Sequence, residues 1–232
     1  SNLAFYRRAK ELGVDFRFNE RVTALIRRKG RVVGVRTDKG GYATDCVVNA
    51  AGAWARQLAF SGGLERAVDP DCHEAGITEP VARFLDPMLV DIRKAPGSAN
   101  YYFHQSALGQ VIFCITPDPA VLGSDRRETS AFLPLCAKRM VQLMPKVAHL
   151  KVRRTWRGLY PMTPDGSPIL GRAPELQGYV DAIGMCGQGY MLGAGVGALV
   201  ARLVTERLRP GDAETLEELR PDRVFAGAEA LK

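Results

Sequence analysis

Features that mark whole classes of protein are scarce in this sequence. Three histidines and five cysteines occur in 232 residues, with no Cys-x-x-Cys pair and no metal-ligand spacing, which argues against a metal centre and a disulfide framework. The cysteines are odd in number, far apart and mostly set in apolar runs. We therefore expect buried free thiols in a reducing compartment, the cytoplasm. The residues in question are Cys46, Cys72, Cys114, Cys136 and Cys186, and His73, His104 and His149.

Segments that target a protein to a membrane are also missing. Residues 1–11 are charged and contain no apolar central region, so they do not resemble a signal peptide. Residues 182–201 carry no charge and reach the length of a membrane span. Glycines recur from Gly184 to Gly197, however, where a strand would turn into a helix. This pattern favours a junction inside a folded domain over a membrane span.

Charge of one sign is not concentrated anywhere along the chain. Lys and Arg outnumber Asp and Glu by 32 to 25, a net charge of +7, but the basic residues are scattered. A nucleic-acid-binding surface gathers them on one face, so we expect no nucleic-acid partner, and an anionic substrate or cofactor explains the surplus equally well. With 46% hydrophobic and 8% aromatic residues, the chain can form a core for one large or two small domains.

Alternating and helical patterns predict short strands and helices in an α+β arrangement of antiparallel sheet and helices. Hairpin strands near the start, separated by turn signals such as Lys29-Gly30, predict a β-meander. The expected strands are 14–18, 22–28, 31–37, 41–44, 46–50, one near Ile77, 88–92, 100–105, 110–115, 152–160, 167–170 and 179–184. The expected helices are 4–12, 53–60, 127–144 and 190–208, with irregular chain at 61–72 and a polar, weakly structured tail from 210 to 232.

Two junctions from strand to helix would bring backbone close to a ligand. The apolar run 46–50 is typical of a strand buried on both faces, and Ala51-Gly52 and a helix follow it. Segment 184–197 carries six glycines at a second junction, whose N–H groups and helix dipole suit a phosphate or a reduced flavin. Taken alone, this glycine pattern is as consistent with close packing of a helix as with a ligand site. It fits a dinucleotide fingerprint poorly, since neither a βαβ unit nor an acidic ribose partner follows.

A third segment, 154–171, combines arginines, aromatic residues and a turn. Thr163-Pro164-Asp165-Gly166 predicts a turn that Asp165 caps, a role we favour over catalysis for this carboxylate. Arg154 and Arg157 are able to clamp a carboxylate, although arginines on a strand beside tryptophan are often structural. No convincing histidine or carboxylate pair for acid–base chemistry is visible.

These three segments, in this order, resemble the D-amino-acid oxidase superfamily of flavoenzymes, which includes glycine oxidase, sarcosine oxidase and dye-linked proline dehydrogenase. The resemblance extends from about Ala4 to Leu208, nearly the whole chain. It implies an FAD-dependent oxidation of a C–N bond in an amino acid or secondary amine, by hydride transfer to FAD. The imine would then hydrolyse in water.

The resemblance also assigns residues to the cofactor and the substrate. The segment at Val22 would pass the adenine ring, the segment at 50–52 would lie beside the pyrophosphate and ribitol, and Gly187 would lead a helix that faces the flavin ring. The cofactor-binding residues so implied are Val22, Ala50, Ala51, Gly52, Trp54, Gly158, Gly187, Gln188, Gly189, Tyr190 and Met191. The implied catalytic residues, on the substrate side of the flavin, are Tyr101, Tyr102, Tyr160 and Met191.

Two departures from the family pattern narrow this interpretation. Tyr160 stands where glycine oxidase-like proteins have an arginine for the substrate carboxylate, and Met191 stands where monomeric sarcosine oxidases have a lysine. The segment 187–193 looks closer to the β-type subunits of multimeric sarcosine oxidase and proline dehydrogenase. The resemblance therefore implies partner subunits or a homo-oligomer.

Family members begin with a strand, a GxGxxG turn and a helix, and this chain has no such segment. We therefore expect a C-terminal fragment that binds FAD weakly or not at all and that is inactive alone. The expected divisions are 1–72, partial FAD-binding domain with the β-meander; 73–155, substrate domain; 156–208, return to the FAD-binding domain; and 209–232, tail. A non-catalytic interaction module of a multi-subunit amine dehydrogenase is the alternative, and an NAD-dependent dehydrogenase is the weakest candidate.

Overall fold

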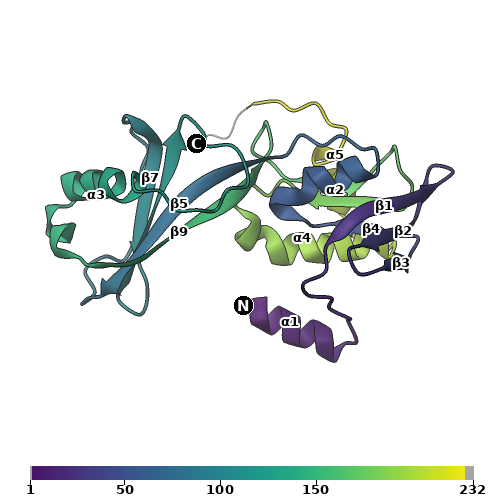
Figure 1. The fold of residues 1–232 in the computed structure, drawn as a ribbon, viewed down its shortest axis with the longest axis horizontal. Helices are drawn as coiled ribbons and strands as arrows, with labels where there is room; N and C mark the ends of the chain where they lie inside the picture. The colour runs from purple at the N-terminus through teal and green to yellow at the C-terminus, as the bar shows by residue number, and fades with distance from the viewer. Residues whose placement is uncertain (1, 228–232) are drawn as a thin grey trace.

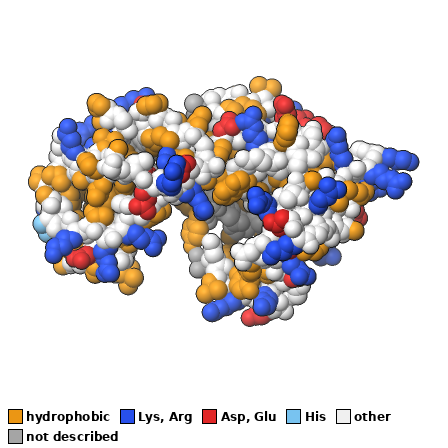
Figure 2. All heavy atoms as spheres, in the orientation of Figure 1, with side chains coloured by type: hydrophobic (Ala, Val, Ile, Leu, Met, Phe, Trp, Pro, Cys, Tyr) orange, Lys and Arg blue, Asp and Glu red, His pale blue; other side chains and the backbone are white. Residues whose placement is uncertain are grey.

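The protein, described here by a computed structural model for residues 2–227, consists of two parts joined by long strands (Figure 1). One part contains a five-stranded sheet and helix α3, and the other contains two three-stranded sheets and helices α2, α4 and α5. The arrangement of antiparallel sheets and helices confirms the α+β class. Basic side chains are spread over both parts of the face shown in Figure 2.

The first part of the chain forms α1 and the predicted β-meander. Helix α1 spans Asn2–Glu11, and strands β1 (Val22–Arg28), β2 (Arg31–Thr37) and β3 (Gly41–Ala43) pair in that order, each antiparallel to the next. The turn between β1 and β2 holds Lys29 and Gly30 at positive φ, as its sequence predicts. The β-meander prediction is therefore confirmed.

A second small sheet supports the segment expected to lie beside a ligand. Its order is β10 (Ile169–Arg172), β11 (Tyr179–Ile183) and β4 (Val47–Asn49), with β4 parallel to β11. The short helix η1 (Gly52–Trp54) and α2 (Ala55–Ser61) follow β4. The expectation that this strand is buried on both faces is wrong, because β4 lies at the edge of the described sheet and Val48 is 39% exposed.

The large sheet has the order β6-β7-β8-β5-β9, and all of its pairings are antiparallel. Its strands are β6 (Leu89–Asp91), β7 (Gly97–Gln105), β8 (Gln110–Asp118), β5 (Asp69–Pro80) and β9 (Val152–Met162). Helices α3 (Phe132–Leu143) and η2 (Pro145–His149) cover one face. A core that includes Tyr101, Phe103 and Phe113 fills the space under α3.

The chain after β11 returns to the smaller sheets. Helix α4 (Gly189–Val204) packs against β10, and α5 (Asp212–Glu218) follows. Arg202 of α4 donates two hydrogen bonds of 2.7 Å to the Asp212 carboxylate at the start of α5. The tail was expected to be weakly structured, and this is wrong for residues 212–218, because that ion pair anchors them. Residues 228–232 of the tail lie outside the described part.

Three further expectations differ from the structure. Residues 14–18 form no strand; the Phe16 and Phe18 rings pack on Tyr6 of α1, at centroid distances of 4.7 and 5.7 Å. Helix α3 begins at Phe132 instead of 127, because Glu74 of β5 accepts the Thr129 N–H and holds the preceding residues in a loop. Irregular chain was expected up to residue 72, yet β5 begins at Asp69, opposite Met162 of β9.

Four of the five cysteines are buried free thiols, as expected, while Cys46 is exposed in the turn before β4. Within residues 2–227, no helix combines the length and apolarity needed to cross a membrane. The same residues contain no cluster of His, Cys, Asp and Glu side chains able to hold a metal ion.

A buried ion cluster joins the segment before β5 to the second small sheet. Arg66 Nε donates to Asp181 Oδ2 at 2.6 Å, and its two terminal nitrogens donate to the Glu175 carboxylate at 3.1 and 3.2 Å. The Arg66 and Asp181 side chains are only 2% and 0% exposed. Burial tends to lower the pKa of Arg66, but its interactions with Glu175 and Asp181 outweigh burial and leave that pKa raised. Burial raises the pKa of the Asp181 carboxyl, against the attraction of Arg66.

Replacement of Arg66 by methionine should destabilise the protein strongly. It leaves the Asp181 carboxylate buried without its partner, a change that costs about 3–5 kcal/mol in comparable pairs. Urea unfolding followed by circular dichroism measures the free energy of unfolding. The matched control is Arg56→Met, which breaks the exposed ion pair between Arg56 and Asp69 and should cost less than about 1 kcal/mol. Equal losses for the two variants would contradict a structural role for the buried cluster.

Candidate functional site

The two faces of the large sheet have different roles. Alternation along the strands places Tyr101 and Phe103 on the face under α3, and Tyr102 on the opposite face. The pairing of β5 with β9 places Tyr160 opposite Asp71 and Gly158 opposite His73, on the same side as Tyr102. We call this surface, defined by Tyr102, Tyr160 and His73, the tyrosine face.

Contacts on the tyrosine face link its three side chains. The hydroxyl oxygens of Tyr102 and Tyr160 are 3.4 Å apart, and the His73 ring stacks on the Tyr160 ring with centroids 4.0 Å apart. Burial first, and then the neighbouring Cys114 and Tyr160, raise the pKa of Tyr102 far above its ordinary value. Tyr102 therefore presents a neutral hydroxyl, able to donate or accept a hydrogen bond, at any physiological pH.

A buried carboxylate supports the histidine of this face. His73 Nε2 lies 3.4 Å from Asp71 Oδ2, and both side chains are almost completely buried. Asp71 Oδ1 accepts the backbone N–H of Val121, which ties the pair to the loop after β8. This pair was not predicted from the sequence, where no histidine or carboxylate pair for acid–base chemistry was visible. The signal was the spacing of two residues on a strand, which puts Asp71 and His73 on one face.

The glycine-rich junction lies directly against Tyr160. Gly184 and Cys186 have φ values of +67° and +49°, so the chain turns sharply between β11 and α4. The Cys186 N–H donates to the Pro161 carbonyl of β9 at 3.1 Å. A Cβ atom on Gly187 would lie only 2.7 Å from the Tyr160 ring. Only glycine therefore allows this close approach of the junction to β9.

Helix α4 starts at this junction with its N-terminus at the tyrosine face. The first turn of a helix has N–H groups without intrahelical acceptors and carries partial positive charge. Gln188, which precedes the helix, supplies no side-chain hydrogen bond to cap it. Tyr190 and Met191 are 73% and 74% exposed on this first turn. The helix end is thus able to stabilise negative charge on a ligand held beside Tyr160.

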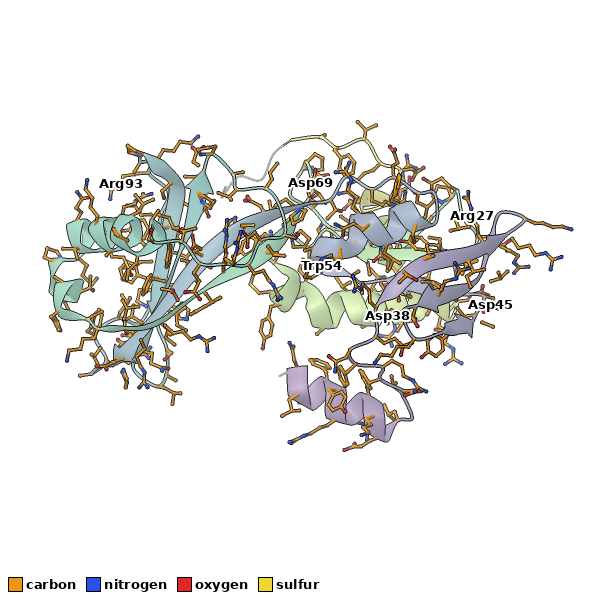
Figure 3. The ribbon with its side chains drawn as sticks, in the orientation of Figure 1. Arg27, Asp38, Asp45, Trp54, Asp69 and Arg93 are labelled. Carbon is orange, nitrogen blue, oxygen red and sulfur yellow. The ribbon has the colours of Figure 1, made fainter. Side chains whose placement is uncertain are left out.

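The turn after β4 is the second backbone segment that the sequence predicted to lie beside a ligand. The fully buried Asn49 side chain donates to the Ala55 carbonyl and the Tyr179 hydroxyl and accepts the Ala51 N–H. These bonds hold Gly52 at a φ of +54°, and η1 contacts β5 and β9. Trp54 is 49% exposed, near the middle of the molecule (Figure 3). Asn49 was not predicted as a site residue, although an asparagine at the end of an apolar run was the available signal.

Other residues singled out from sequence lie apart from this group. Tyr101 faces α3, is fully buried and donates its hydroxyl to the Arg139 carbonyl at 3.0 Å, so it does not share a surface with Tyr102. Val22 lies at the start of β1, 40% exposed. Asp165 accepts the Ser167 N–H and pairs with Arg223, which agrees with the expected capping role. Gly158 lies on the tyrosine face, with open space where a Cβ would stand.

Comparison with known proteins gives a consistent result. The model of the family described as "DAO: FAD dependent oxidoreductase" matches residues 2–203. The chain is 32% identical to the hydrogen cyanide synthase subunit HcnC of Pseudomonas protegens, over 90% of this chain and 48% of that protein. It is 28% identical to the sarcosine oxidase subunit beta of Rhizobium meliloti, over 96% of this chain and 51% of that protein. The chain therefore spans about half the length of these curated relatives.

Solved structures share the fold. The L-proline dehydrogenase from P. horikoshii superposes with a TM-score of 0.82 at 30% identity, covering 94% of this chain and 57% of that one. The glycine oxidase from Geobacillus kaustophilus also superposes with a TM-score of 0.82, at 24% identity, covering 97% of this chain and 57% of that one. The family model covers most of the described chain and the predicted resemblance is confirmed: the protein belongs to the DAO family of FAD-dependent oxidoreductases.

Proposed function

We propose that this chain forms the substrate side and part of the flavin side of an enzyme that oxidises a C–N bond of an amino acid or amine with FAD. The observation that carries the proposal is the contact of Gly187 with the Tyr160 ring. It puts the N-terminus of α4 and the hydroxyls of the tyrosine face around one position. The first turn of α4 and the tyrosine face would together hold the flavin ring.

The residues present fit such a cofactor. Gly52 and Gly158 have no atom within 4 Å of where a Cβ would stand, so the described chain leaves space beside both. The uncapped first turn of α4 suits the pyrimidine edge of the flavin, which becomes negative on reduction. When bound, FAD would supply the hydride acceptor, which no protein side chain provides.

The chain's own residues would position the substrate and exclude water. The hydroxyls of Tyr102 and Tyr160 would hydrogen-bond to the substrate, and His73, beside Asp71, would fix the Tyr160 ring. The five-stranded sheet would shield the reacting carbon from solvent. Because a neutral amine can lose hydride without a base, this scheme assigns no proton transfer to the protein.

The relatives guide the choice of substrate and partners. Their names include sarcosine oxidase, L-proline dehydrogenase and glycine oxidase, so an amino acid or secondary amine is the proposed substrate class. Tyr160 offers a hydroxyl instead of a positive charge, so recognition would rely on hydrogen bonds. Two relatives are subunits by name, so we also propose partner subunits for this protein, in the cytoplasm.

A second candidate is a non-catalytic interaction module within a larger assembly. Its support is a set of exposed apolar side chains on β4 and α4, namely Val48, Tyr190 and Met191. Such a surface commonly marks a contact with another protein or domain. Concentration-dependent self-association without flavin would favour this candidate over the enzyme.

FAD added to the isotope-labelled chain should shift the backbone NMR signals of Gly52, Gly158 and Gly187. We expect weak binding, because about half of a relative's length is not in this chain. Gly187→Ala should weaken binding by about tenfold or more, since overpacking against Tyr160 displaces the junction. The control is Gly197→Ala, later in α4, where the described chain leaves open space for a Cβ. Signals at these glycines that stay fixed while others move would contradict the proposed site.

In the FAD-loaded protein, an amino acid or secondary amine should bleach the visible flavin absorbance under anaerobic conditions. Tyr102→Phe should slow this reduction by about tenfold, because one orienting hydrogen bond is lost. Tyr101→Phe removes the neighbouring hydroxyl on the opposite face and should leave the rate unchanged. Stopped-flow absorbance measures the rate of flavin reduction for both variants. Equal slowing by the two variants would show that the tyrosine face is not the substrate side.

A further inference from the structure

A separate cavity of about 280 Å³ lies on the α3 side of the large sheet, opposite the tyrosine face. It is partly open to solvent and is lined by β5, β7, β8, β9, the loop after β8 and the start of α3. Most of its lining is apolar, with Ile115, Phe132 and Leu135 among its walls. Two charged side chains, Arg157 and Glu74, also line it.

The arginine of this cavity has unused hydrogen-bonding capacity. One terminal nitrogen of Arg157 donates to the Arg127 carbonyl at 3.1 Å. Its Nε atom is buried and has no hydrogen-bond partner among the described residues. Nor does any carboxylate in residues 2–227 lie within 4.0 Å of this guanidinium. A buried N–H without an acceptor is costly, so the site favours a ligand that supplies one.

Glu74 is the direct cross-strand neighbour of Arg157, yet the two do not form an ion pair. The Glu74 carboxylate instead accepts the N–H of Thr129 at 2.6 Å and its hydroxyl at 2.7 Å. Opposite charges at paired positions are normally close enough to interact. Here the loop after β8 binds the two side chains separately, Arg157 through the Arg127 carbonyl and Glu74 through Thr129. One positive and one negative group therefore face the same apolar cavity.

Cys72, the third functional group of the cavity, adds no charge. Its thiol donates to the Gly123 carbonyl at 3.3 Å. Burial raises the pKa of the Cys72 thiol, and the nearby positive charge of Arg157 offsets only part of that rise. The thiol therefore stays protonated and does not neutralise Arg157.

We propose that this cavity binds a small α-amino acid with an apolar side chain. Its carboxylate would accept hydrogen bonds from Arg157, its ammonium group would donate to Glu74, and its side chain would contact Ile115, Phe132 and Leu135. The site lies on the far side of the sheet from the tyrosine face, so it is an effector site and not the substrate site. Its residues adjoin His73 and Gly158 on the same strands, which links the two faces physically.

The test is isothermal titration calorimetry of the purified chain without flavin. L-leucine should bind with a saturable heat. Isocaproate lacks the ammonium group and isoamylamine lacks the carboxylate. Each should bind at least about tenfold more weakly than leucine. Arg157→Gln should remove leucine binding. The matched control is Arg154→Gln, an exposed arginine on the same strand with its guanidinium over Trp156, which should leave leucine binding intact.

Three results would overturn the proposal. No saturable heat with leucine means that the cavity has no such ligand. Leucine binding that survives Arg157→Gln places the ligand elsewhere. Isocaproate that binds as tightly as leucine shows that Glu74 plays no part. Because the measurement uses no flavin, none of these results bears on the proposed FAD site.

Discussion

The close packing of Gly187 on the Tyr160 ring is the constraint on which the functional architecture depends. It fixes the start of α4 against β9, and β9 belongs to the sheet that carries Tyr102 and His73. A residue with a side chain at this position would push the helix end away from the sheet. The first turn of α4 and the side chains of the tyrosine face therefore lie together because one glycine lacks a Cβ.

The remaining structure holds this junction in place from several directions. Asn49 fixes the turn after β4 through three hydrogen bonds, and the hydrogen bond from Cys186 to Pro161 ties the junction to β9. The Arg66–Asp181 pair connects the chain entering β5 to the sheet beneath α4. The Asn49 and Asp181 side chains are fully buried, so losing a partner would leave a buried polar group unsatisfied. The site is thus built from polar contacts inside a mainly apolar framework.

Local patterns in the sequence predict much of the fold, because turn residues and apolar periodicity act over short distances. The β-meander and the glycine-rich start of α4 follow from such signals. The strand expected at 14–18 does not form, because Phe16 packs on Tyr6 of α1 instead. Helix α5 was not predicted, because it is stabilised by an ion pair between Arg202 of α4 and Asp212. The pairing of β5 with β9 fixes which side chains meet. Tyr101 and Tyr102 face opposite ways by strand alternation alone, but only the packing of α3 shows which of the two faces the core.

A difference absorption spectrum of FAD, recorded as the purified chain is added, tests the central claim most directly. A flavin beside Tyr160 and the N-terminus of α4 should show a perturbed visible band that grows with protein concentration and needs at least about tenfold more protein with Gly187→Ala. The spectrum of free FAD, unchanged at millimolar protein, would contradict the claim that this junction contacts the flavin.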